Sequence, residues 1–189
     1  MLMLDAYFFV LAIFLQDGIR LSPMQAGYFI VFQGCGFILA SFFAARLVLQ
    51  YGKNVLIFGV LLLMFSLVFQ LVLFYYQSID YKGYFVMFLH GIGVALVLPS
   101  FANIALKDLP QNRIGNASGV YSTLQQLFGA LGITLTGGVF YYFAKGKTDY
   151  KDFYNAFFYG TLIHLLCLTS VLLILFLLPN SVLPAKTEK

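Results

Sequence analysis

The sequence predicts an all-α, polytopic membrane protein, and three observations support this fold class. The chain of 189 residues is 61% hydrophobic and only 10% charged, whereas a soluble domain carries roughly 25% charged residues. Its mean hydropathy is +0.91. Its seven acidic and eleven basic residues lie in short gaps between apolar runs or at the ends of those runs, because a charge in hydrocarbon is costly. We therefore expect no acidic side chain near the middle of the membrane.

Six apolar segments are predicted to form one transmembrane bundle over residues 1–179, followed by a polar C-terminal tail over 180–189. The last five segments are long enough for the roughly 20 residues that a spanning helix needs. The first is short, and we interpret it as the C-terminal part of a longer helix whose beginning is missing. The segments are 2–16, 23–45, 54–76, 84–106, 116–143 and 156–178.

The gaps between the segments carry signals for helix ends and for the membrane surface. Ser22, Pro23 and Gln25 predict a capped helix start, and Asn155 and Pro179 are expected to bracket the last helix. The chain has no Trp, so tyrosine is expected to form the interfacial belt. Two tyrosine-rich gaps should share one membrane face, since an even number of crossings separates them. Their tyrosines are Tyr75, Tyr76, Tyr81, Tyr84, Tyr141, Tyr142, Tyr150 and Tyr154.

The segment 116–143 combines small and polar residues at helical spacing. One stripe consists of Ser118, Ser122, Gln125, Gly129, Gly132 and Thr136, and the opposite stripe consists of Val120, Leu124, Leu127, Leu131 and Leu135. In a membrane the leucine stripe should face lipid and the polar stripe should face protein or water. The glycines, including the pair Gly115 and Gly119, are best explained by close helix packing. For Gln125 and Gln126 two readings stay open: a substrate cavity, or hydrogen bonding to packing neighbours.

Isolated polar residues occur inside other segments. Gln33 and Asn103 are further candidates for a cavity lining, as are Ser118 and Ser122 of the segment 116–143. His90 and His164 are either hydrogen-bonded packing residues or protonatable groups on a transport path, since histidine changes charge near neutral pH.

Several classes of function are excluded by what the sequence lacks. The net charge of +4 is small and scattered over the gaps, so nucleic acid is not an expected partner. Cys35 and Cys167 stand alone, and no metal-ligand spacing is present. Residues 91–93 read Gly-Ile-Gly without a third glycine, so neither dinucleotide binding nor another cofactor is predicted. The sequence contains neither a nucleophile with an adjacent base nor paired acids at helical spacing, so it does not predict an enzyme.

Three stretches in order resemble the C-terminal half of major facilitator superfamily transporters. They are LSPMQAGYFIVFQGCGFILASFFAARLVLQYGKNVLIFG (21–59), GIGVALVLPSF (91–101) and GNASGVYSTLQQLFGALG (115–132). The likeness is greatest to the fourteen-helix drug:proton antiporter branch, of the multidrug efflux type. It implies a six-helix half of the transporter fold, with the loops around 46–54 and 107–115 cytoplasmic and the tyrosine-rich gaps external.

The sequence departs from this family in two places. In the loop over 45–54, Leu47, Gly52 and Lys53 match the family's cytoplasmic loop motif, whereas Ala45, Leu49 and Gln50 replace its Gly, Asp and Arg. In the glycine-rich helix, Ser122 and Gln125 replace an Asn and an Arg that the family often has.

The resulting hypothesis is the C-terminal half of a proton-coupled exporter that moves small amphipathic compounds by alternating access. Its partners would be the lipid bilayer, a small-molecule substrate, and the missing N-terminal half or a second copy. It would lie in the inner (plasma) membrane with a cytoplasmic C-terminus, a side favoured by six Lys and Arg against five. The alternative is a truncated or split-gene fragment or accessory subunit without transport activity of its own.

Overall fold

The computed structural model describes residues 2–77, 79–106 and 109–177, and these residues form helices without any strand. The helical fold class is therefore confirmed. The predicted tail over 180–189 and Pro179 lie outside the described residues. The elements are α1 (Leu2–Ile13), the π-helical turn η1 (Phe14–Gly18), α2 (Pro23–Tyr51), α3 (Lys53–Tyr75), α4 (Tyr81–Leu106), the short 3-10 turn η2 (Gln111–Arg113), α5 (Ile114–Ala144) and α6 (Tyr150–Leu177).

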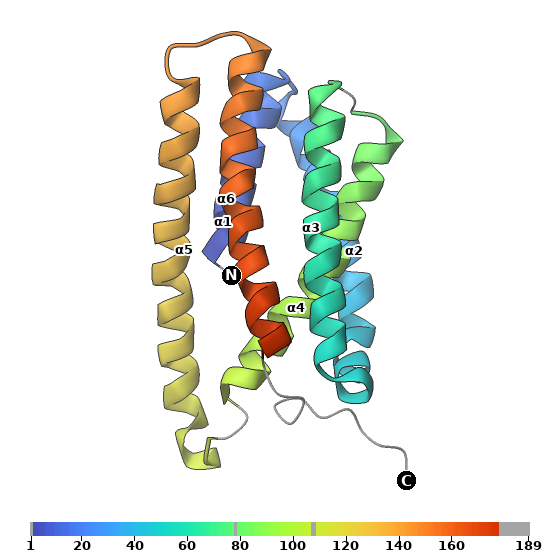
Figure 1. Cartoon of the computed structure of the whole chain (residues 1–189), viewed down its shortest axis with the longest axis vertical. Coiled ribbons are helices and arrows are strands. Elements are labelled where there is room, and N and C mark those ends of the chain that lie inside the picture. The colour runs from blue at the N-terminus through green and yellow to red at the C-terminus, as the bar shows by residue number, and fades with distance from the viewer. Residues whose placement is uncertain (1, 78, 107–108, 178–189) are drawn as a thin grey trace.

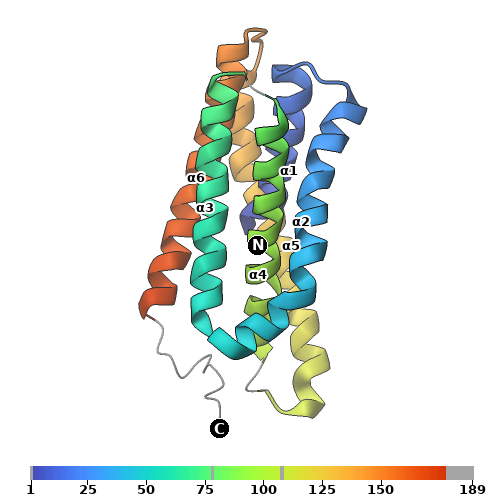
Figure 2. The ribbon, with the colours of Figure 1, turned by 90° about the vertical axis from the view of Figure 1, so that its right-hand side faces the viewer.

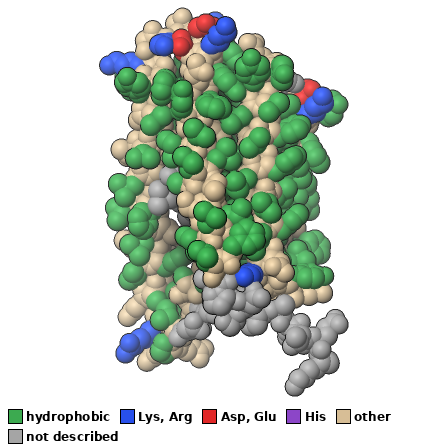
Figure 3. All heavy atoms as spheres, viewed as in Figure 1, with side chains coloured by type: hydrophobic (Ala, Val, Ile, Leu, Met, Phe, Trp, Pro, Cys, Tyr) green, Lys and Arg blue, Asp and Glu red, His purple; other side chains and the backbone are tan. Residues whose placement is uncertain are grey.

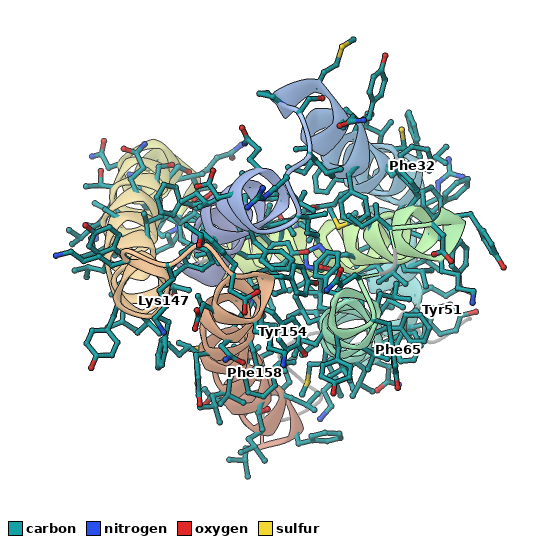
Figure 4. The ribbon with its side chains drawn as sticks, turned by 90° about the horizontal axis from the view of Figure 1, so that it is seen from above. Phe32, Tyr51, Phe65, Lys147, Tyr154 and Phe158 are labelled. Atoms are coloured by element: carbon teal, nitrogen blue, oxygen red, sulfur yellow. The ribbon has the colours of Figure 1, made fainter. Side chains whose placement is uncertain are left out.

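Five of the described helices are long and apolar enough to cross a membrane, namely α2 to α6. The helix α1 has 12 residues and is not among them, so length and composition give five spans where the sequence predicted six helices. Figure 3 shows apolar side chains over the wall of the bundle, with charged side chains gathered toward its two ends. Figure 4 shows Phe32 of α2 and Phe65 of α3 on the outside of the bundle. This outer surface fits hydrocarbon.

The helices form two groups of three that stand side by side (Figure 1). In one group α5 packs on α1 and on α6, and in the other α4 packs on α2 and on α3. The contact between α3 and α6 is the main link between the groups. Figure 2 shows the same pairs after a quarter turn. The helix α1 begins at about mid-height of the bundle, where Figure 1 marks the N-terminus.

The start of α2 has the predicted capping box. The Ser22 amide donates to Gln25 Oε1 over 2.9 Å, and the Gln25 amide donates to Ser22 Oγ over 3.3 Å. The predicted start of the last helix near Asn155 is wrong, because α6 already begins at Tyr150. Its first turn includes Lys151 and Asp152, which are charged residues that water can solvate at a membrane surface. The apolar run alone therefore placed this boundary too late.

The connection between α2 and α3 is a single residue. The sequence predicted a loop over 45–54, but α2 continues to Tyr51 and α3 begins at Lys53. Gly52 between them has φ 59° and ψ −134°, a conformation that glycine adopts without steric cost. Its amide donates to the Val48 carbonyl over 2.8 Å, which closes the end of α2.

Two glycines allow the backbones of α2 and α4 to approach closely. A Cβ at Gly36 of α2 would overlap the carbonyl oxygen of Phe88, and a Cβ at Gly91 of α4 would overlap the carbonyl oxygen of Gln33. Small residues have this role in membrane helix pairs, where close backbone packing replaces the hydrophobic effect as a source of stability.

The two tyrosine-rich gaps lie at the same end of the bundle, as predicted. We call this end the tyrosine-rich end and the other, which carries the α2–α3 turn, the Gly52 end. The Tyr150 hydroxyl donates to the carbonyl of Phe74, and the Tyr154 hydroxyl donates to the carbonyl of Leu71 over 3.2 Å. The Tyr154 ring also contacts Tyr75, with ring centres 5.7 Å apart. Figure 4, which looks down on this end, shows Tyr154 between α6 and α3.

Candidate functional site

A cluster of polar side chains lies at the centre of the bundle, and we call it the polar core cluster (Tyr7, Gln70, Met87, His90 and His164). The Tyr7 hydroxyl donates to Gln70 Oε1 over 2.5 Å, and Gln70 Nε2 lies 3.4 Å from Met87 Sδ. The Tyr7 ring stacks on the His90 ring, with ring centres 4.8 Å apart, and meets the His164 ring edge-on, with ring centres 5.8 Å apart. The cluster thus joins α1, α3, α4 and α6.

Both histidines of the polar core cluster are buried without full hydrogen bonding. His90 is fully buried, and neither of its ring nitrogens has a hydrogen-bond partner among the described residues; the same holds for Nδ1 of His164. A buried polar atom without a partner costs roughly 1–3 kcal/mol. The sequence left open whether these histidines are packing or protonatable groups, and both readings remain predictions.

Removal of the Tyr7 hydroxyl should destabilise the bundle. In Tyr7→Phe the Gln70 amide oxygen loses its donor inside the core, so we expect the free energy of unfolding to fall by about 1–3 kcal/mol. Chemical unfolding in detergent micelles, followed by circular dichroism, measures this change. The matched control is Tyr84→Phe on α4, whose ring contacts Phe29 and Phe32 survive the change. Equal stability of the two variants would contradict the expected result.

A cavity of about 500 Å³ lies beside this cluster, between α3, α4, α5 and α6. We call it the Gln125 cavity. Its walls are mostly aliphatic and aromatic side chains, and its polar lining comes from Tyr121, Gln125, His164 and Cys167. Leu4 of α1 also lines it. His164 therefore belongs both to the cavity wall and to the polar core cluster.

Of the predicted cavity residues, the structure places Gln125 on this cavity. Ser118 is half-buried, and Ser122, Gln126 and Asn103 are exposed. Gln33 is buried where α2 meets α4, and its Oε1 has no hydrogen-bond partner among the described residues. The structure therefore does not bring the six residues together in one cavity, and their roles toward a substrate remain predictions.

The predicted packing glycines of α5 fall into two pairs. Gly129 and Gly132 are buried, and Gly129 faces α1. Gly115 and Gly119 are exposed, and no atom lies within 4 Å of a Cβ built on either one. Nothing among the described residues packs on Gly115 or Gly119, so close packing at this pair stays a prediction.

The remnant of the loop motif falls on helices and on the turn between them. Leu47 lies in α2 and packs with Ala44, Val55 and Leu96. Gly52 forms the turn, and Lys53 opens α3.

A second hollow, of about 670 Å³, lies between α1 and α5 toward the tyrosine-rich end. We call it the α1–α5 groove. Phe9, Ile13 and Asp17 line it from the α1 side, and Gly137 and Gly138 line it from α5. The sequence did not predict this groove, because nothing in it indicated that these two helices would be neighbours.

The structure places Asp5 beside the middle of α5. A Cβ at Gly129 would lie 2.8 Å from Asp5 Oδ2, and Gly129 is 15 residues from either end of α5 (Ile114–Ala144). The sequence placed Asp5 at the end of an apolar segment. That end lies at about mid-height of the bundle, and the Asp5 side chain is exposed there.

The signal for Asp5 was present in the sequence. Residues 2–11 read LMLDAYFFVL, so Asp5 interrupts an apolar run rather than lying in a gap between two runs. Tyr7 and Met87 carry no such signal, since both are ordinary residues of apolar helices. Only the assembled bundle brings them to Gln70 and the histidines.

The apolar helices around a partly polar interior define the class of this protein: it is an integral membrane protein of the α-helical type. The profile of the Major Facilitator Superfamily matches residues 1–133. The chain therefore belongs to this superfamily, whose members are transporters rather than enzymes. The resemblance seen in the motifs is thereby confirmed.

Two curated relatives carry the name "Putative multidrug resistance protein MdtD". The chain is 28% identical to the one from Escherichia coli over 134 residues, and 29% identical to the one from Citrobacter koseri over 136 residues. Each match covers 68% of this chain and 27% of the relative. The chain thus spans about a quarter of the length of the relatives that it matches.

Proposed function

We infer that this chain is the C-terminal six-helix half of a secondary transporter, a proton-coupled exporter that moves small amphipathic compounds by alternating access. Membership of the superfamily supports transport. The relatives named for multidrug resistance support an exported amphipathic compound. The Gln125 cavity is the observation on which the inference chiefly rests.

The chemistry of the Gln125 cavity suits such a substrate. Its volume of about 500 Å³ lies within the roughly 300–1,000 Å³ of small-molecule sites, which are mostly apolar with a few polar groups that set orientation. The lining offers an amide at Gln125, a phenol at Tyr121 and an imidazole at His164. Such a lining can bind an apolar body and also one or two hydrogen-bonding groups.

The pairing of the helices supports the assignment to one half of the fold. The first helix of the triplet α1–α3 packs on the middle helix of the triplet α4–α6, and the first helix of α4–α6 packs on the middle helix of α1–α3. The helices α1 and α4 run in opposite directions along the bundle (Figure 1). Nested inverted repeats of three helices are typical of each half of these transporters.

The proposed setting is the inner (plasma) membrane, with the Gly52 end and the C-terminus cytoplasmic. The slight excess of Lys and Arg on that side supports this orientation, as do the loop positions in the family. The alternative is a fragment or accessory subunit without transport activity of its own. It is supported by the match to the relative, which covers only 27% of the relative's length.

Reconstitution into liposomes tests the proposal. The chain is inserted alone or together with the N-terminal six helices of an MdtD relative, and a pH gradient is imposed. We expect efflux of a fluorescent amphipathic cation, such as ethidium, that depends on the gradient and needs both halves. A gradient-dependent signal from the relative's half alone would be the background to subtract. The absence of efflux from the paired halves would contradict the proposal and favour the alternative.

A further inference from the structure

We propose that the α1–α5 groove binds one molecule of phosphatidylethanolamine from the leaflet at the tyrosine-rich end. One acyl chain would lie between the two helices, and the head group would lie between Asp17 and Lys145. Such a lipid is separate from the transported compound, since the α1–α5 groove and the Gln125 cavity share no lining residue.

The α1–α5 groove opens on the side of α5 that carries the leucine stripe. Gly138 follows Leu131 by seven residues, and Thr134 follows Leu127 by seven residues, so each pair shares a face of the helix. Leu127 and Leu131 are exposed on the bundle, where the sequence predicted contact with lipid. Figure 4 shows α1 beside α5. The space between them is therefore accessible from the bilayer.

The length of the groove matches the depth of one leaflet. Its α5 wall runs from Ile133, one turn beyond the centre of the helix, to Ala144, the last helical residue. This part of α5 rises about 17 Å, and half of the hydrocarbon core of a bilayer is about 15 Å thick. A single acyl chain, rather than a compact solute, has this length.

The walls of the groove are apolar, and two glycines keep it open. No atom lies within 4 Å of a Cβ built on Gly138, and a Cβ built on Gly137 would lie 3.1 Å from the Phe9 ring. The hydroxyl of Thr134 donates to the Ala130 carbonyl over 2.8 Å, so it is not a free donor on the wall. The remaining apolar lining comes from Ile13, Ile133, Phe140, Ala144 and Phe153.

The mouth of the groove carries one charge of each sign. Asp17 of η1 and Lys145, the residue directly after α5, both line it and are both exposed. Neither forms an ion pair within the described part of the chain, whereas the neighbouring Lys147 pairs with Asp152 over 2.8 Å. Lys145 Nζ lies 5.7 Å from the centre of the Tyr141 ring. The mouth thus offers a cation and an anion to a ligand.

This pair of charges suits a zwitterionic head group with a primary ammonium. Lys145 can bind the phosphate, and Asp17 can accept hydrogen bonds from the ammonium. The α1–η1 segment and α5 both end at this surface, and the C-terminal ends of helices also attract a cation. The anionic phosphatidylglycerol would bring no cation to Asp17, and the quaternary ammonium of phosphatidylcholine has no N–H to donate. Phosphatidylethanolamine supplies both groups.

Native mass spectrometry of the full chain tests the site. The protein is incubated in detergent micelles with equal amounts of phosphatidylethanolamine, phosphatidylglycerol and phosphatidylcholine that have identical acyl chains. We expect one phosphatidylethanolamine to be retained severalfold more than either other lipid. Gly138→Leu should lower this retention severalfold, because its side chain fills the groove. The matched control is Gly27→Leu on α2, where a Cβ also meets no atom within 4 Å and the position is exposed outside the groove.

The head-group contacts are tested separately from the groove. Asp17→Asn should remove the preference for phosphatidylethanolamine over phosphatidylglycerol, and Lys145→Gln should lower the retention of both. Lys82→Gln is the control for Lys145→Gln, because Lys82 also lies over a tyrosine ring, that of Tyr81, at 5.9 Å but outside the groove. Equal retention of the three lipids by the unmodified chain would overturn the proposal, as would equal losses in Gly138→Leu and Gly27→Leu.

Photo-crosslinking in liposomes locates the acyl chain. Phosphatidylethanolamine with a diazirine on one acyl chain should form adducts concentrated in residues 9–17 and 133–145. Adducts spread evenly over the outer surfaces of α2 and α3 would instead show ordinary surrounding lipid and contradict a specific site. The experiment is repeated with the N-terminal six helices of an MdtD relative present. Loss of the adducts there would show that a protein surface fills the groove and would also overturn the proposal.

Discussion

Gly91→Ala is expected to force α4 away from α2 and to lower the free energy of unfolding by about 3 kcal/mol. The new methyl group would overlap the carbonyl oxygen of Gln33 and would lie 2.9 Å from the amide nitrogen of Phe37. Both neighbours are backbone atoms, so no change of side-chain rotamer can relieve the overlap. Chemical unfolding in mixed micelles, followed by circular dichroism, measures the loss. Gly36→Ala should have the reciprocal effect, because its methyl group meets the carbonyl of Phe88.

Helix α2, the partner of α4 in this contact, supplies matched controls for this prediction. Gly27 and Gly34 lie on α2, and no atom stands within 4 Å of a Cβ built on either one. Gly27→Ala and Gly34→Ala should therefore be neutral or stabilising, since alanine is the better helix former by up to about 1 kcal/mol. If Gly91→Ala proved as stable as Gly34→Ala, the close approach of α2 and α4 would be refuted.

Gln125→Leu is expected to lower gradient-driven efflux by about tenfold in the paired liposome assay, with unchanged insertion into the membrane. The leucine keeps the size of the side chain approximately but removes the amide from the Gln125 cavity. The loss of a hydrogen bond to a polar group of the substrate there costs about 1–3 kcal/mol of binding free energy. A loss of about 1.4 kcal/mol lowers the binding constant tenfold. The concentration dependence of efflux shows whether the loss falls on substrate binding.

The neighbouring residue provides the control for Gln125. Gln126 is exposed and lies outside the lining of the cavity, so Gln126→Leu changes the same chemical group at the same depth without touching the cavity. We expect efflux close to that of the unmodified pair. An equal loss in both variants would point to an effect on the whole helix, and no loss in Gln125→Leu would sink its assignment to the substrate site.

Features that depend on one helix at a time could be predicted from the sequence. The composition and the five long apolar runs identified the fold class, and the motifs identified the family. The periodicity of 116–143 indicated the outward face of α5: Val120, Leu127, Leu131 and Leu135 are all exposed on the bundle. The capping box at Ser22 was equally local, because Ser22 and Gln25 satisfy each other within one turn.

Features that depend on which helices meet could not be predicted in this way. The close packing of α2 on α4, which buries Gln33 between them, was not indicated by the sequence. The bond between Tyr7 and Gln70 joins residues 63 positions apart, and no periodicity within α1 or α3 indicates it. The position of Asp5 beside Gly129 was missed for a related reason, because the sequence does not indicate that α1 packs on α5.

The tyrosine bonds between α3 and α6 have a mechanical consequence. Tyr150 and Tyr154 tie α6 to the last turns of α3 through the carbonyls of Phe74 and Leu71, whereas the start of α3 meets α6 through apolar packing, in a cluster that includes Leu56 and Leu175. With 23 residues, α3 is a lever of about 35 Å. A tilt of a few degrees about the hydrogen-bonded end would displace the Gly52 end of α3 by a few ångströms, and that end is where the contact consists of apolar side chains alone.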